Sequence, residues 1–172
     1  MSRIDSPSKP AFVSKPVVSH AATATFDATG WRTFFNYRDL GISAATGGEY
    51  DFRIVLAQGG EPVSTGWHYH ELHAQIVFCL SGWELIALED GRIVKMLPGS
   101  CLNIPPTYLH NEFAYSPDMQ MLVLTRPAEV VTVAVPAPDG WSEESVTAEA
   151  PAETTPERLQ VSWSWKPVAD EF

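Results

Sequence analysis

Short runs of residues with an apolar side chain at every second position follow one another through most of the chain. A period of two residues is typical of a β-strand whose two faces differ in their surroundings. Residues 50–58 show the pattern clearly, because Phe52, Ile54 and Leu56 alternate with other residues up to a pair of glycines. Further strands are predicted at residues 31–40, 75–80, 83–89, 92–97, 109–115, 119–125 and 130–135.

The residues between these runs predict how the strands are joined. Asp90-Gly91 separates two apolar runs and is a strong signal for a β-hairpin. Residues 116–118 predict a second pair, formed by 109–115 and 119–125, and residues 44–48 predict a loop. No periodic helix of ten residues precedes residue 140. About nine short strands with turns between them therefore predict an all-β sandwich or barrel.

The composition divides the chain into three parts. Residues 1–30 hold three prolines and no helical period, so we expect an extended N-terminal arm. Residues 31–136 hold the predicted strands, and residues 137–172 form an acidic tail rich in proline and alanine. Trp163 and Trp165 share one face if this tail ends in a strand, and we expect them to dock on the domain.

The charge and the cysteines narrow the class of protein. The 172 residues carry a net charge of −10 without a basic cluster, which argues against nucleic acid as a partner. There is no apolar run of about 20 residues and no secretory signal, so we expect a cytoplasmic protein that does not cross a membrane. Cys79 and Cys101 lie in apolar runs and are predicted to be buried free thiols.

Two histidines two residues apart supply the candidate chemistry. On a strand, His68 and His70 point to the same face, with their Cα atoms roughly 6.5 to 7 Å apart. Gln75 opens the next strand, and His110 opens a later one after Pro105-Pro106. Three imidazoles and an amide oxygen suit one divalent transition metal, namely Fe(II), Mn(II), Ni(II), Co(II) or Zn(II), without choosing among them.

These residues resemble the two sequence motifs of the cupin superfamily. The first motif, G-x5-H-x-H-x3,4-E-x6-G, is matched by His68, His70 and Gly82, with Gly60 or Gly66 as a loose first glycine. The second, G-x5-P-x-G-x2-H-x3-N, is matched by Gly99, Pro105 and His110. The resemblance implies a double-stranded β-helix, or jelly-roll barrel, with His68, His70, Gln75 and His110 as metal ligands and, as often in cupins, a homodimer.

Three positions depart from these motifs. Thr107 stands where the second motif has a turn glycine, and Ala114 stands where it has the closing asparagine. Gln75 stands where the first motif has glutamate. A neutral amide leaves a divalent site with one more unit of positive charge than a carboxylate does, which favours a stronger Lewis acid.

A general base must then come from another residue. Glu112 is the leading candidate, because it lies two residues after His110 and shares that residue's face on a strand. Tyr108, Glu71 and His73 are further candidates. The aromatic residues Trp67, Tyr69, Phe78 and Trp83 are near enough in sequence to line the same cavity.

Two classes of function remain open. An enzyme would act on a small organic molecule, either as a non-haem iron dioxygenase or as a redox-free lyase or isomerase. A non-enzymatic module would use the metal for structure, or the barrel for binding a ligand. A metal position left open to solvent would favour the enzyme, whereas saturation of the metal by Glu71 or His73 would favour the structural role.

Overall fold

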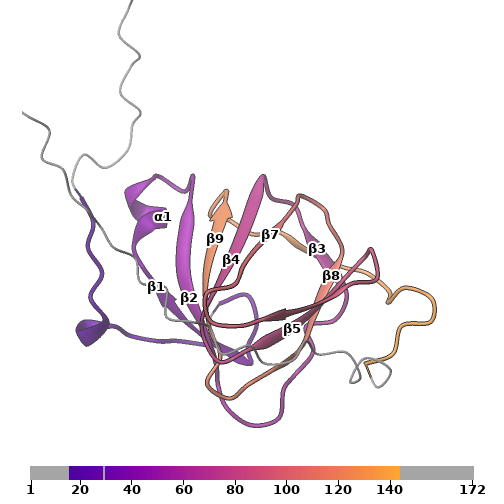
Figure 1. Ribbon diagram of the computed structural model, residues 1–172. Coiled ribbons are helices and arrows are strands. Elements are labelled where there is room, and N and C mark those ends of the chain that lie inside the picture. The colour runs from indigo at the N-terminus through magenta and orange to yellow at the C-terminus, as the bar shows by residue number, and fades with distance from the viewer. Residues whose placement is uncertain (1–15, 29, 144–172) are drawn as a thin grey trace, which may run out of the picture.

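Two antiparallel β-sheets face each other across a common interior (Figure 1). The computed structural model describes residues 16–28 and 30–143. Strands β1 to β10 span Phe35–Asp39, Asp51–Ala57, His68–His70, Ala74–Ser81, Glu84–Leu88, Ile93–Met96, Cys101–Ile104, His110–Tyr115, Gln120–Arg126 and Thr132–Ala134. The first sheet, sheet A, has the order β1-β2-β9-β4-β7, and the second, sheet B, has the order β10-β3-β8-β5-β6. The predicted all-β architecture is confirmed.

Helical structure is confined to two short segments of the described residues. A 3-10 turn, η1, spans Ala21–Thr23, and helix α1 spans Ile42–Ala45. Helix α1 lies beside β2 and includes residues 44 and 45 of the loop that was predicted at residues 44–48, whereas residues 46–48 form a turn as expected (Figure 1). It begins directly after Gly41, whose φ of 78° is well suited to glycine. In the part of the chain that the structure describes, neither helix has the length and apolar character needed to cross a membrane.

Strand β4 shows how the alternating pattern produces the two faces of sheet A. Gln75, Val77 and Cys79 are buried, whereas Phe78 and Leu80 are exposed on the outer face. The first three side chains therefore point into the barrel, as their spacing predicted. Burial also raises the pKa of the Cys79 thiol to about 11, so this thiol stays protonated at neutral pH.

The core lies between the sheets and is built by most of the strands. Its main cluster contains Phe35, Tyr37, Val55, Val77, Cys79, Ile86, Leu88, Met96, Ile104, Tyr115, Met119, Met121 and Val123. A second cluster on the other side of sheet B contains Trp67, Ala87 and Phe113, against which Trp141 packs. The prediction that Cys101 is buried is wrong, because its thiol is exposed.

The chain changes sheets at a corner formed by Gly82 and the turn 116–119. The Trp83 main-chain N–H donates to Ser116 Oγ over 2.8 Å, which joins the end of β4 to the end of β8. Gly82 has a φ of 65°, and a Cβ placed there would come within 2.7 Å of the Met119 main chain. Strands β4 and β5, and likewise β8 and β9, therefore belong to different sheets. The predicted pairing of 109–115 with 119–125 is wrong for this reason.

The hairpin at Asp90-Gly91 forms as predicted. Strands β5 and β6 pair in antiparallel register, with Glu84 opposite Met96 and Ala87 opposite Ile93. The site residues of the second motif lie on β8, which is the next strand on the other side of β5. Sheet B thus carries β3, β8 and β5 side by side, and the three strands present their inner faces to one cavity.

Candidate metal centre

Three histidines from two neighbouring strands meet on the inner face of sheet B. His68 and His70 lie on β3, and His68 is directly opposite His110 of β8. All three side chains are buried, with His110 fully so. The ring centroid of His110 lies 4.3 Å from that of His68 and 5.2 Å from that of His70. The structure therefore brings together the three imidazoles that the sequence motifs singled out.

Each of the three rings is oriented by a hydrogen bond at Nδ1. His68 Nδ1 lies 2.7 Å from the Gly66 carbonyl oxygen, and His110 Nδ1 lies 2.8 Å from that of Tyr108. His70 Nδ1 lies 3.0 Å from Thr132 Oγ1 on the adjacent strand β10. A carbonyl can only accept, so Nδ1 carries the proton in His68 and His110 and leaves the Nε2 lone pair free. Metal-binding histidines are commonly oriented in this way.

The Nε2 atoms converge at a position that suits a cation. One coordinating atom from each of the three histidines lies within 4.8 Å of the others. Nε2 of His110 is buried and has no hydrogen-bond partner among the described residues. Burial lowers the pKa of His68 and that of His70, so both rings are neutral near pH 7 and can donate a lone pair. Because an unpartnered buried nitrogen is costly, a divalent transition metal fits this donor set.

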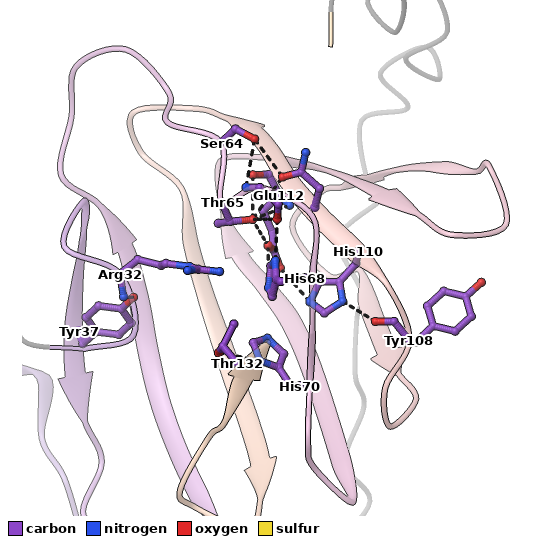
Figure 2. A network of polar contacts seen from close by, with 12 residues as sticks. Arg32, Tyr37, Ser64, Thr65, His68, His70, Tyr108, His110, Glu112 and Thr132 are labelled. Atoms are coloured by element: carbon purple, nitrogen blue, oxygen red, sulfur yellow. Dashed lines mark hydrogen bonds and ion pairs between the residues drawn. The ribbon is translucent and has the colours of Figure 1, made fainter. Parts of the chain in front are cut away.

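Glu112 lies beside this cluster, on the same face of β8 as His110 (Figure 2). Its Oε1 is 3.6 Å from His110 Nε2, and its Oε2 is 3.7 Å from His68 Nε2. Burial opposes ionisation of Glu112, whereas the hydrogen bond from Thr65 and, when the rings are protonated, the positive charges of His110 and His68 favour it, and the pKa of Glu112 is lowered. The carboxylate is therefore held ionised next to the three imidazoles.

The loop before β3 fixes the position of Glu112. Thr65 Oγ1 donates to Glu112 Oε2 over 2.6 Å, and the main-chain N–H of Glu112 donates back to Thr65 Oγ1 over 3.1 Å. Ser64 Oγ donates to Asn111 Oδ1 over 3.0 Å, which ties the same loop to β8. These contacts leave the carboxylate little freedom to turn away from the histidines (Figure 2).

Gln75 reaches the cavity from sheet A, on the opposite side from most of the other polar groups. It is buried and lines the same cavity as His68 and His70. Its side-chain amide makes no hydrogen bond within the described part of the chain. The amide is therefore available to a ligand in the cavity, and its role as fourth metal ligand stays a prediction.

The other predicted bases lie outside the cavity. Glu71 and His73 are exposed, and neither lines the cavity. Tyr108 contributes its carbonyl oxygen to His110, but its side chain points away from the cluster (Figure 2). The Tyr108 side chain lies instead near Asp90 and Arg92, which pair with each other outside the cavity. Of the four candidates, the structure places Glu112 alone at the histidines.

Several residues of the cavity could not be found from the motifs. Trp67 packs in the second cluster and Phe78 is exposed, so the aromatic wall is not the predicted one. The cavity is lined instead by Trp31, Arg32, Phe35, Tyr37, Val55, Thr65, Glu84, Met121, Val123 and Thr132, in addition to the predicted residues. Those in the runs 31–40, 50–58, 83–89, 119–125 and 130–135 were predicted to lie in strands, but nothing in the sequence marked them as residues of a site.

Glu84 is a second buried carboxyl group on the cavity wall. It lies on β5, is 5% exposed and makes no hydrogen bond with described residues through its side chain. Burial raises the pKa of Glu84 well above its usual value, and the charge of Glu112 raises it further. Burial thus favours the neutral form of Glu84, whereas the neighbours of Glu112 favour its ionised form.

The architecture matches solved structures of the cupin superfamily. The polyketide cyclase RemF from Streptomyces resistomycificus superposes with a TM-score of 0.60 over 73% of this chain and 89% of that chain, at 18% identity. An RmlC-like cupin from Shewanella frigidimarina superposes with a TM-score of 0.52 over 67% of this chain and 94% of that chain, at 16% identity. The chain therefore adopts the cupin fold, which confirms the prediction from its motifs.

Sequence comparison adds one curated relative. The quercetin 2,3-dioxygenase of Bacillus subtilis is 27% identical over 70 residues. These residues make up 41% of this chain and 20% of that enzyme, so the similarity covers a minor part of the longer protein. No family model matches the chain.

Proposed function

We propose that this protein is an enzyme that binds one divalent transition metal and transforms a small organic molecule inside the barrel. One observation carries the proposal. Three buried imidazoles, each oriented by a hydrogen bond at Nδ1, present their Nε2 atoms to one position next to the carboxylate of Glu112, which lines the cavity. His68, His70 and His110 would hold the metal, with Gln75 as the fourth ligand. Neither Glu71 nor His73 reaches the metal position, so a saturated structural site is the less supported reading.

Each side chain has a separate task in this proposal. When bound, the metal supplies a positive charge that polarises an oxygen atom of the substrate. Glu112 accepts a proton from the substrate and holds it at a carboxylate oxygen next to the metal ligands. Thr65 orients the carboxylate through the 2.6 Å hydrogen bond to Oε2. The apolar residues of sheet A exclude water from the reacting atoms.

The position of Glu112 favours a redox-free reaction, in which a proton is removed from a carbon next to a carbonyl group. A lyase, an isomerase or a cyclase can begin with this step, and the superposed RemF is a polyketide cyclase. The second candidate is a non-haem iron dioxygenase. The similarity to quercetin 2,3-dioxygenase over 70 aligned residues favours it.

Proton exchange distinguishes the two reactions. Protein stripped of metal is loaded with Zn(II), Ni(II), Co(II), Mn(II) or Fe(II) and mixed in D2O with 1,3-diketones and hydroxylated aromatic ketones. Under nitrogen, we expect exchange of the proton next to the carbonyl, at least about a hundredfold slower in Glu112→Gln. The exposed Glu71→Gln serves as the matched control and should leave the rate unchanged.

The outcomes separate the candidates. Exchange that is equally fast in Glu112→Gln would rule out Glu112 as the base. Oxygen uptake by the Fe(II) protein, without exchange under nitrogen, would select the dioxygenase. Absence of both, together with absence of metal binding, would reject the enzymatic proposal.

A homodimer and a cytoplasmic location remain predictions. Residues 1–15 of the predicted arm and most of the predicted tail, including Trp163 and Trp165, lie outside the described residues. Light scattering tests the dimer directly, since a molar mass near 18.9 kDa would mean a monomer.

A further inference from the structure

The segment that precedes β1 closes one side of the metal cavity and brings an arginine into it. Trp31 and Arg32 both line the cavity, although they are more than 30 residues away from His68 in sequence. Figure 2 shows the Arg32 side chain extending from this segment toward His68. We propose that Arg32 binds a carboxylate group of the substrate, so that the enzyme acts on small organic acids. This inference rests on the proposed function, because it assigns the substrate to the same cavity.

Among the arginines that the structure describes, Arg32 is the one whose guanidinium has no ion-pair or hydrogen-bond partner in the described residues. Three of the others form ion pairs, Arg53 with Asp51, Arg92 with Asp90 and Arg126 with Glu49, and Arg38 donates to Ser19 Oγ over 3.0 Å. The Arg32 guanidinium makes no ion pair and no hydrogen bond in residues 16–28 and 30–143. A partly buried guanidinium without an acceptor retains all five N–H donors for a ligand.

Two contacts hold the main chain so that Arg32 faces inward. The main-chain N–H of Arg32 donates to the Tyr37 hydroxyl over 2.8 Å. The Arg53 guanidinium lies over the Trp31 ring, 4.3 Å from its centroid, and Asp51 pairs with this guanidinium. The segment is therefore attached to β1 and to β2, and the direction of the Arg32 side chain does not depend on a flexible loop.

The apolar residues of the cavity indicate what the remainder of the ligand is like. Phe35, Val55, Val77, Met121 and Val123 form an apolar wall on sheet A. A ligand that satisfies both parts has an apolar body and one carboxylate. A guanidinium is planar and forms two parallel hydrogen bonds with a carboxylate, which a carboxamide of the same shape cannot accept in the same way.

The test compares acids with their amides. Propanoate, benzoate and 3-phenylpropanoate are each titrated by calorimetry against the matching amide, in protein without metal and in protein loaded with Zn(II). We expect the wild type to bind at least one acid about tenfold tighter than its amide in both forms. In Arg32→Gln this preference should fall below about twofold, and in Arg32→Lys it should be intermediate.

The controls keep the result specific to Arg32. Arg92→Gln removes an exposed arginine that pairs with Asp90, and it should retain the tenfold preference. Metal content is measured for every variant and should be unchanged in Arg32→Gln. Thermal unfolding verifies that each variant is folded.

Three results would overturn the proposal. The first is an unchanged preference in Arg32→Gln, and the second is a wild type that prefers no acid over its amide. The third is a preference that appears only with metal and persists in Arg32→Gln, since the metal itself would then bind the anion. Failure of the proposed function is seen separately, because the metal-free protein tests Arg32 whether or not a metal binds or a reaction occurs.

Discussion

The two sheets of the barrel present different surfaces to the same cavity. Sheet B contributes a polar wall, which consists of His68, His70, Glu84, Glu112 and Thr132, and the fully buried His110 lies against the two histidines of this wall. Sheet A contributes an apolar wall, which consists of Phe35, Val55, Val77, Met121 and Val123, together with the hydroxyl of Tyr37 and the amide of Gln75. All the candidate histidines are thus on one sheet, and most of the apolar contact surface is on the other.

The difference shows how a small barrel can bury many polar groups. A buried polar group without a partner costs free energy, so polar groups are best placed where partners are near. Two groups of the polar wall have such partners in sheet B and in the loop before β3, since His70 contacts Thr132 and Glu112 contacts Thr65. The apolar wall needs none and is free to contact a substrate. Substitutions on each wall test whether the two walls act separately.

Removal of one histidine from the polar wall should have the largest effect. We expect His110→Ala to weaken metal binding at least about a hundredfold, because loss of a supporting partner alone weakens it ten- to a hundredfold. Metal analysis after dialysis measures the effect. The exposed His73→Ala is the matched control and should keep the metal. Equal metal content in both variants would contradict the ligand assignment.

Truncation on the apolar wall should affect stability and leave metal binding intact. Met121 is 2% exposed, so Met121→Ala opens a cavity in the core. We expect the free energy of unfolding to fall by about 2 to 5 kcal/mol, measured by urea unfolding of the metal-free protein. Ile76→Ala, at an exposed position on the outer face of the same sheet, should cost much less. A large loss of metal in Met121→Ala would show that the walls are coupled.

Glu84 should make the stability of the metal-free protein depend on pH. Burial raises the pKa of Glu84 in the folded protein, so the folded state binds the proton more tightly than the unfolded chain does. Stability should therefore fall as the pH rises above the unfolded pKa of about 4.3, by at most about 1.4 kcal/mol per pH unit. Urea unfolding between pH 5 and 8 should show a smaller decline for Glu84→Gln than for the wild type.

The control for this prediction is the exposed Glu61→Gln, which should behave as the wild type. Parallel pH curves for the wild type and Glu84→Gln would mean that Glu84 does not hold its proton in the folded protein.

The smallest effect is expected at the turn that joins the two walls. Thr107 lies between β7 and β8 and has a φ of 60°, which is unfavourable for a β-branched residue. Thr107→Gly should raise the free energy of unfolding by about 1 kcal/mol without changing metal content. Thr107→Ala keeps the Cβ and should gain less. Destabilisation by the glycine would mean that the threonine side chain has a favourable contact that offsets the strain.

The local patterns in the sequence predicted most strands and part of the site. The spacing of His68 and His70 determines that both lie on one face, and the same holds for His110 and Glu112. The positive φ of Thr107 also agrees with the turn glycine that the second motif has at this position. These features depend on residues within a few positions of one another, where a period of two is informative.

Features that depend on distant residues could not be predicted. A short polar turn such as 116–118 looks the same whether it joins paired strands or leads from one sheet to the other. In β2 the apolar pattern predicted that the face with Phe52 and Ile54 is buried. The buried residues are instead Asp51 and Val55, on the other face, where Arg53 neutralises the charge of Asp51. Arg32 and Thr65 reach the cavity through the topology, and nothing near them in the sequence marks a site.

The anchors of His68 and His110 are main-chain carbonyl groups two residues earlier in the chain. A substitution at residue 108 replaces a side chain that points away from the cavity, but it leaves the carbonyl oxygen in place. The orientation of these two imidazoles is thus insulated from most mutations of their neighbours. In a barrel built in this way, substitutions can change the residues that line the cavity, and with them the molecules that bind, while the orientation of the two histidines stays the same.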